Sequence, residues 1–191
     1  MAWIAENRRE PLQKSDKPLL TDEMKKHLSE KYLPRYATKR AAVMPALHYI
    51  QHTYNYIPMQ AIEELAEFLE LAPAEVLDTA SFYEEFWLKP KGKYLVQVCH
   101  SLACEICGSK QITNHLKKKL GIDVHETTPD GKFTLVELEC MGSCGTAPVV
   151  GINEVLLENV TIEQLDKTLE ELPADPADFK DPSIDWQLDD H

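Results

Sequence analysis

Five cysteines are confined to positions 99–144 of this chain, and their spacing restricts its possible folds more than any other feature. They form a C-x4-C pair, a single cysteine three positions further on, and then a C-x3-C pair. Each pair follows a run typical of a β-strand, residues 94–98 before the first and 133–138 before the second. Loops that follow strands are held by a rigid sheet edge, so the two pairs can converge on one point. The cysteines are Cys99, Cys104, Cys107, Cys140 and Cys144.

The rest of the composition is typical of a globular chain in a reducing compartment. With 191 residues, 43% hydrophobic and 27% charged, the chain can bury a core without disulfides. Its net charge of −12 argues against nucleic acid or an anionic membrane surface as the main partner. No run approaches the roughly 18 apolar residues of a membrane span, and charge interrupts the N-terminus too early for a signal peptide. We therefore expect a cytoplasmic protein whose cysteines bind metal or do redox chemistry.

The two cysteine pairs together supply the four thiolates that a [2Fe–2S] cluster requires. Small residues surround both pairs, so backbone amides can approach the sulfurs closely and donate hydrogen bonds to them. These small residues are Ser101, Ala103, Gly142, Ser143 and Gly145. The sequence therefore predicts one [2Fe–2S] cluster, with the ligands Cys99, Cys104, Cys140 and Cys144.

The same cysteines also suit three other kinds of site. A structural zinc site needs the same four thiolates but favours C-x2-C spacing. A thiol–disulfide oxidoreductase could use Cys104 and Cys107, which are spaced as C-x-x-C. A plant-type ferredoxin would bind its cluster through Cys99, Cys104, Cys107 and Cys140, but it leaves Cys144 unexplained and expects a β-grasp fold. Histidine ligation by His100 is not needed, because a complete cysteine set is present; His115 and His125 are expected on the surface.

Hydrophobic periodicity divides the chain into regions. Apolar positions recur at helical spacing between residues 21 and 90. Thr21 is suited to cap the first helix of this region, and Pro45 should lie either in the first turn of a helix or at a kink. Residues 91–172 follow a β-α-β-β-β-α order, with a helix closed by Gly121 and two expected hairpins, 124–127 with 133–138 and 149–152 with 155–157. We expect an α+β chain with an N-terminal arm (1–20), a helical bundle (21–90), a cluster domain (91–172) and an acidic C-terminal tail (173–191).

Several motifs along the chain resemble those of one family, the thioredoxin-like [2Fe–2S] ferredoxin subunit of the NADH dehydrogenase module of respiratory complex I. The resemblance covers about residues 32–172. Its parts are Lys39–Pro45 with His48, Tyr56–Pro58, Ala80–Tyr83, the C-x4-C pair at Cys99, Glu126–Leu135 and Glu139–Pro148. Similar subunits occur in NAD-reducing hydrogenases and NAD-dependent formate dehydrogenases.

The resemblance implies a helical bundle followed by a thioredoxin-like domain, with Cys99, Cys104, Cys140 and Cys144 on the family's ligand positions. It implies a non-catalytic electron-transfer subunit of NADH-quinone oxidoreductase. Its partners would be a flavoprotein subunit with FMN, the NADH site and a [4Fe–4S] cluster, and other peripheral-arm subunits. The complex would hold the chain at the cytoplasmic side of the bacterial inner membrane, without direct membrane contact. Equivalent subunits of a hydrogenase or formate dehydrogenase, and a free-standing ferredoxin, remain alternatives.

Two features depart from the family pattern or go beyond it. Cys107 stands where the family commonly has another residue, and the acidic tail is not a general family feature. No G-x-G-x-x-G motif follows a strand, so NADH is expected to bind on the partner.

The helical region from about Thr21 to Phe86 plays no part in ligation and is rich in aromatic residues. We therefore expect it to be the main docking surface for the flavoprotein subunit.

Overall fold

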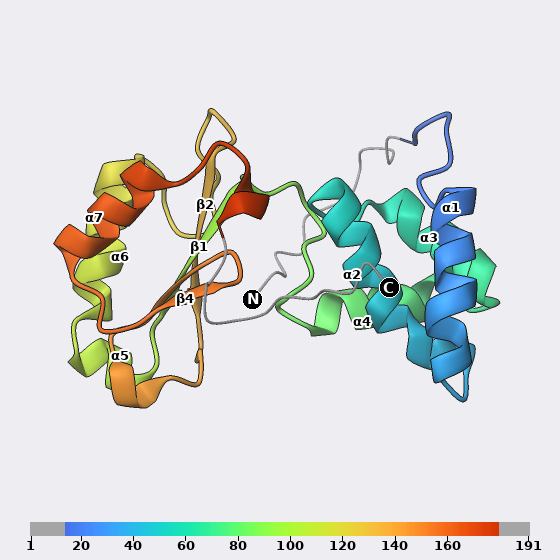
Figure 1. The fold of residues 1–191 in the computed structure, drawn as a ribbon, viewed down its shortest axis with the longest axis horizontal. Coiled ribbons are helices and arrows are strands. Elements are labelled where there is room, and N and C mark those ends of the chain that lie inside the picture. Colours follow the sequence, from blue (N-terminus) through green and yellow to red (C-terminus); the bar gives the residue numbers. More distant parts are fainter. Residues whose placement is uncertain (1–13, 180–191) are drawn as a thin grey trace. The chain divides into compact units, whose positions relative to one another are not determined.

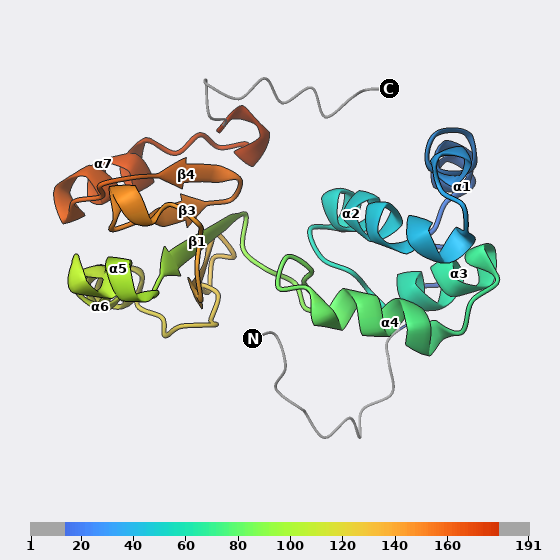
Figure 2. The same cartoon turned by 90° about the horizontal axis from the view of Figure 1, so that it is seen from below.

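The structure, a computed structural model, describes residues 14–179 and divides between Pro90 and Lys91 into two units (Figures 1 and 2). We call residues 14–90 the helical unit and residues 91–179 the sheet unit, and describe each by itself. Within the described range, no helix combines the length and apolar character needed to cross a membrane. The predicted N-terminal arm (1–20) and acidic tail (173–191) lie partly outside this range.

Local sequence signals account for the elements of the helical unit. The Thr21 hydroxyl accepts a hydrogen bond from the Met24 amide and caps the first helix. That helix continues through a π-helical turn and ends in a 3-10 turn that contains Pro34. Pro45 lies in the first turn of the second helix, where its missing N–H has no cost. The elements are α1 (Asp22–His27), the π turn Leu28–Tyr32, the 3-10 turns Leu33–Arg35 and Lys39–Ala42, α2 (Val43–Tyr54), α3 (Met59–Leu69) and α4 (Pro73–Phe82).

The apolar stripes of these helices meet in one core. Its members come from every helix of the unit, and the predicted stripe of α3 is confirmed because Ile62, Leu65 and Leu69 are buried. Phe86 closes the core beyond the end of α4. Tyr83 and Phe82 lie outside this core: Tyr83 is 42% exposed and Phe82 is 78% exposed. Other aromatic side chains of the unit are partly buried and pack against the core, namely Tyr32, Tyr49, Tyr54 and Phe68.

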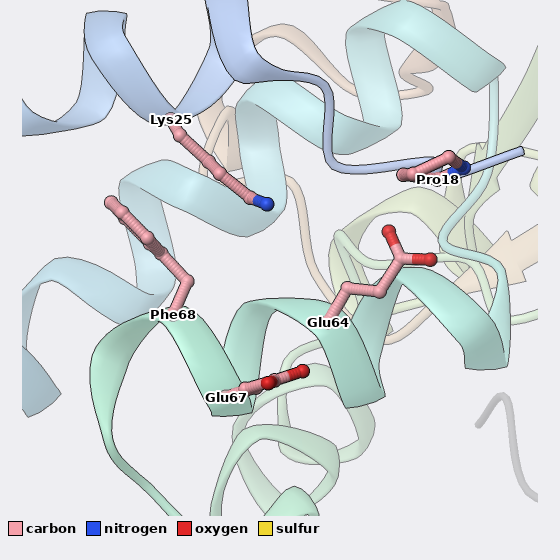
Figure 3. Close-up of a pocket in the computed structure, with 5 residues that line it drawn as sticks. All are labelled: Pro18, Lys25, Glu64, Glu67 and Phe68. Atoms are coloured by element: carbon pink, nitrogen blue, oxygen red, sulfur yellow. The ribbon is translucent and has the colours of Figure 1, made fainter.

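The end of the predicted arm belongs to the helical unit. Leu20 is fully buried, and the Glu64 carboxylate accepts hydrogen bonds from the amides of Leu19 at 2.8 Å and Leu20 at 2.6 Å. Figure 3 shows Glu64 of α3 in a pocket that is also lined by Pro18 and by Lys25 of α1. Leu19 and Leu20 precede α1, so their amides have no carbonyl partner within a helix, and the carboxylate accepts their hydrogen bonds instead. The folded part therefore begins before residue 21, while residues 1–13 of the arm lie outside the described residues.

The sheet unit has four strands in the order β2-β1-β3-β4. β1 and β2 are parallel and are joined by a crossover through two helices, whereas β3 is antiparallel to both β1 and β4. The elements are β1 (Tyr94–Cys99), α5 (Leu102–Ile106), α6 (Ser109–Leu120), β2 (Phe133–Leu138), β3 (Val150–Ile152), β4 (Val155–Leu157) and α7 (Ile162–Glu171). The predicted order is confirmed, except that the short helix α5 is not anticipated by the sequence.

One face of this sheet carries the core of the unit. Tyr94, Val96 and Val98 alternate along β1 and share a hydrophobic cluster with residues of α6 and α7, such as Leu116 and Leu165. Figures 1 and 2 show both helices on this side of the sheet. Because side chains alternate along a strand, Cys99 points to the opposite face of β1 from Val98. The cysteine is thus kept out of the main hydrophobic core.

Two predictions for the sheet unit hold only in part. The segment 124–127 pairs with β2 as predicted but irregularly: three backbone hydrogen bonds join residues 125–128 to residues 133–135, and the antiparallel bridge Thr127–Thr134 lies among them. His125 has a left-handed φ of 69°, so the segment is not a regular strand. The predicted tail begins with residues that pack on the sheet unit. The Tyr94 hydroxyl donates to the Pro173 carbonyl, and the Phe179 ring lies edge-on to Tyr94 at 6.4 Å. The remainder of the tail, residues 180–191, lies outside the described residues.

Gly92 provides a test of this packing. A Cβ atom at Gly92 would lie 2.7 Å from the carbonyl carbon of Phe133, and the Gly92 amide donates to the Thr134 hydroxyl at 2.6 Å. We expect Gly92→Ala to destabilise the sheet unit by about 1–3 kcal/mol, because the β2 backbone must move. Hydrogen exchange of β1 and β2 peptides in the full chain measures this. Gly145→Ala is the control, since no atom lies within 4 Å of its Cβ position; equal exchange in both variants would contradict the expectation.

Candidate functional site

The parallel pairing of β1 and β2 brings the two cysteine pairs together. Cys99 is the last residue of β1 and lies beside Leu138, the last residue of β2, so Cys140 follows only two residues beyond the same sheet edge. Two backbone hydrogen bonds hold this corner: the His100 amide donates to the Leu138 carbonyl at 3.0 Å, and the Cys99 amide donates to the Val149 carbonyl at 3.2 Å. Three chain segments that are distant in sequence therefore meet beside Cys99.

The short helix α5 turns the second cysteine of the first pair back toward this corner. It starts after Ser101, and the Glu105 amide donates to the Ser101 carbonyl at 2.9 Å. Cys104 is 1% exposed and Cys99 is 2% exposed, and both pack with Val149. The first pair is thus held rigidly in a small hydrophobic cluster of its own. Met141 and Ala147 cover the edge of that cluster.

The second pair lies on an exposed loop, and Gly142 permits its shape. Gly142 has a φ of 77°, a left-handed conformation that other residues adopt only with strain. Its amide donates to the sulfur of Cys140 at 3.4 Å. Cys144 begins a 3-10 turn that ends at Thr146. Cys140 and Cys144 are exposed, so the site has one buried side and one side that is open to solvent.

The sulfurs of the two pairs interact with one another. Burial acts to raise the pKa of Cys99, and the side chains of Cys104 and Cys140 are among the groups that lower it. Burial raises the pKa of Cys104 to about 11, with the hydrogen bond to Cys99 acting in the same direction. The charge of the Cys140 sulfur raises the pKa of Cys144, and burial adds to this. Because iron binds the thiolate form, cluster assembly must displace protons from Cys104 and Cys144.

Backbone amides supply the compensating hydrogen bonds. Burial acts to raise the pKa of Cys99, but hydrogen bonds from the amides of Ser101 and Met141 and from neighbouring thiols outweigh it, and the pKa is lowered. The Val149 amide donates to the sulfur of Cys104. Ser101 is one of the small residues beside which the sequence predicts such donors, whereas Met141 and Val149 are not among them. A backbone donor leaves no side-chain signature, so the sequence contains no signal for them.

A comparison with protein families identifies the type of site. The family model for thioredoxin-like [2Fe–2S] ferredoxins matches residues 29–173, which include both units and all five cysteines. The chain belongs to this family. The predicted α+β class and the family resemblance are therefore confirmed. The match extends across the helical unit from residue 29, so this unit is part of the family pattern.

Curated relatives of this ferredoxin are subunits of one kind of oxidoreductase. NADH-quinone oxidoreductase subunit 2 of Thermus thermophilus is 42% identical over 137 residues, which are 71% of this chain and 76% of the relative. An NADH-quinone oxidoreductase subunit of Rickettsia felis is 40% identical over 157 residues, 81% of this chain and 94% of the relative. Among solved structures, an NAD⁺-reducing [NiFe]-hydrogenase matches with a TM-score of 0.60 and 26% identity, over 67% of this chain and 22% of the hydrogenase chain.

The cysteine group of this ferredoxin fits a [2Fe–2S] cluster by its chemistry. It offers four sulfur donors, three of which have backbone N–H groups directed at them, and such groups help to balance the negative charge of a cluster. In residues 14–179, no group of three or more His, Cys, Asp or Glu side chains is arranged to hold a single metal ion. The support for a [2Fe–2S] cluster is therefore the kind of donor atoms present, four sulfurs, and not an arrangement of side chains around a single metal ion.

Cys107 does not join the group. It is exposed at the end of α5, and its amide donates to the Ala103 carbonyl at 3.1 Å. It is not among the groups that shift the pKa values of Cys99, Cys104 and Cys144. Interactions among Cys99, Cys104, Cys140 and Cys144 thus shift pKa values within the site, and Cys107 is not part of that group; the plant-type set would require Cys107 and omit Cys144.

The histidines have other partners in the structure. The Nε2 atom of His100 lies 3.6 Å from a carboxylate oxygen of Glu139. His115 is predicted on the surface, but its side chain is only 29% exposed and lies 2.7 Å from the Asp166 carboxylate of α7. This contact joins α6 to α7, and Lys119 adds a second ion pair to Asp166 at 3.0 Å. His125 is exposed as predicted.

The two ligand sets can be separated by substitution. We expect Cys107→Ser to keep the cluster, because Cys107 lies outside the sulfur group, and Cys144→Ser to lose or strongly perturb it. The visible absorption spectrum and iron content of the anaerobically purified variants measure this. A Cys107→Ser/Cys144→Ser double variant controls for ligand exchange. A colourless Cys107→Ser protein beside a normal Cys144→Ser protein would establish the plant-type set instead.

Proposed function

We propose that this chain is the electron-transfer subunit of an NADH-quinone oxidoreductase and that Cys99, Cys104, Cys140 and Cys144 bind its [2Fe–2S] cluster. One observation supports the proposal: the paired ends of β1 and β2 lead into the two cysteine pairs, in a chain whose family is that of thioredoxin-like [2Fe–2S] ferredoxins. The names of its curated relatives give the complex.

The cluster supplies a one-electron couple, and the chain sets the conditions under which that couple works. Buried Cys99 and Cys104 keep water from one side of the site. The amides of Ser101, Met141 and Val149 offset the negative charge on the sulfurs. The exposed pair, Cys140 and Cys144, leaves the other side accessible to a partner. The chain itself then makes and breaks no bonds of the substrate.

The partner in this proposal is a flavoprotein subunit that carries FMN, the NADH site and a [4Fe–4S] cluster, within a peripheral arm on the cytoplasmic side of the membrane. Two features of this chain support a partner. The sequence lacks a dinucleotide-binding G-x-G-x-x-G motif, so NADH must bind elsewhere. Large apolar side chains are exposed beside the cysteine group, where Leu102 is 74% and Ile106 is 77% exposed.

A second candidate is the equivalent subunit of an NAD-reducing hydrogenase. The observation in its favour is the structural match to such an enzyme, with a TM-score of 0.60. The chain spans 22% of that hydrogenase chain, whereas it spans 94% of the Rickettsia felis relative. The near-complete match favours the quinone-linked complex. Copurification of the chain with quinone-reducing or with hydrogenase subunits separates the two.

The cluster assignment predicts a definite composition. We expect two irons and two acid-labile sulfides per chain, because four thiolates and two bridging sulfides complete a [2Fe–2S] centre. Reduction should produce the EPR signal of a rhombic spin-one-half centre. Elemental analysis of anaerobically purified protein, together with EPR at low temperature, measures both. One zinc and no iron in that preparation would refute the assignment.

The docking hypothesis can be tested at a defined residue. Phe82 at the end of α4 is 78% exposed and belongs to the Ala80–Tyr83 motif. If it anchors the flavoprotein subunit, Phe82→Ala should weaken binding by about 30-fold, since interface aromatics contribute about 2 kcal/mol or more. Titration of the purified flavoprotein subunit measures the affinity. Leu156→Ala is the control, because Leu156 is an exposed apolar residue of the sheet unit, outside the predicted docking region; an unchanged affinity for Phe82→Ala would place docking elsewhere.

A further inference from the structure

A carboxylate distant in sequence is bound to the loop that carries Cys144. Glu158 lies between β4 and α7, and one of its oxygens is hydrogen-bonded to two hydroxyls of that loop, Ser143 and Thr146. The Thr146 hydroxyl donates to it at 2.5 Å, and the two hydroxyl oxygens lie 2.7 Å apart. Each hydroxyl has one proton, and the shared carboxylate oxygen accepts both. One of these hydroxyls precedes Cys144 in the sequence and the other follows it, and both are hydrogen-bonded to the Glu158 carboxylate.

Two backbone hydrogen bonds also join the segment 158–160 to the chain just after Cys144. The Asn159 amide donates to the Thr146 carbonyl at 2.7 Å, and the Val160 amide donates to the Pro148 carbonyl at 3.0 Å. Val160 is buried in the core of the sheet unit, and Thr161 caps α7 directly after it. The segment 158–160 is therefore anchored at one end, and it ties the otherwise exposed cysteine loop to the start of α7.

The attachment also places a negative charge beside the loop. Hydrogen bonds from Ser143, and then from Thr146, lower the pKa of the Glu158 carboxyl, which is thus ionised at neutral pH. None of the ion pairs found between described residues involves Glu158. Its charge is therefore not cancelled by a neighbouring cation of the described chain, and it acts on the electrostatic environment of the adjacent sulfurs.

We propose that Glu158 is a positioning residue for the Cys144 side of the site, and that its charge holds the reduction potential of the centre below the value it would otherwise have. The inference rests on the proposed function, because it takes Cys144 as a cluster ligand. The carboxylate has two separable roles. It accepts the two hydroxyls that shape the loop, and it disfavours the extra negative charge that reduction adds.

Two substitutions in the full-length chain separate these roles. Glu158→Gln keeps an oxygen that can accept both hydroxyls but removes the charge, so we expect a raised reduction potential and a nearly unchanged rate of cluster loss. Glu158→Ala removes both, so the potential should rise and loss of iron to a chelator should be roughly 30-fold faster, since each of the two lost hydrogen bonds contributes a factor of about five. Glu154→Gln is the control, since it removes an exposed acidic residue of the β3–β4 turn.

The measurements are a redox titration followed by EPR, the rate of iron loss to EDTA, and amide hydrogen exchange at Asn159 and Val160. Faster exchange at these amides in the Glu158→Ala chain supports the positioning role without any cluster. Wild-type potential, iron loss and exchange in both Glu158 variants, with normal iron content, would overturn the inference and leave the proposed function intact. A wild-type chain without iron would instead refute the proposed function, and exchange at the two amides would then decide the positioning role. If Glu158→Ala does not fold, the potential of Glu158→Gln relative to Glu154→Gln decides the role of the charge.

Discussion

The parallel pairing of β1 with β2 is the constraint on which the site depends. Its register places Cys99 beside Leu138, and only this register brings Cys140 to the same corner of the sheet. A slip of one residue would turn Cys99 toward the core formed with α6 and α7, because side chains alternate along a strand. The buried side chains of Val96 and Leu135 oppose such a slip. The hydrophobic core thus sets the geometry of the cysteines, although it does not contain them.

Grouping four sulfurs has an electrostatic cost, and the local backbone offsets it. The pKa values of Cys104 and Cys144 are raised, since burial and neighbouring sulfurs disfavour their charge. Amides of the strand ends and loops donate to three of the sulfurs. An acidic chain and the Glu158 carboxylate act in the opposite direction. The potential of a bound cluster therefore reflects a balance between nearby dipoles and nearby charges.

The helical unit is organised on a different principle. Its core is built from local helical stripes and is completed by Leu20 and Phe86 from outside the helices. It contributes none of the cysteines, yet the family match includes it from residue 29. Most of its aromatic residues serve this core, and Tyr36, Phe82 and Tyr83 stay exposed. The exposed aromatic residues of this unit and the exposed Leu102 and Ile106 of the sheet unit are thus two separate apolar surfaces of one chain.

Local signals in the sequence predicted the strands, most helices and the four cysteines that meet, because periodicity, caps and strand–loop junctions depend on neighbouring residues. Spacing alone could not choose between Cys107 and Cys144, since both spacings suit a [2Fe–2S] cluster. The tertiary structure decided their surroundings: α5 buries Cys104 and leaves Cys107 exposed at its end, whereas Cys144 lies near the sulfurs of Cys99 and Cys140. The burial of Leu20, the exposure of Tyr83, the His115–Asp166 contact and the bonds from Glu158 to the cysteine loop were likewise decided only in three dimensions. They depend on residues far apart along the chain, and no local pattern encodes such contacts.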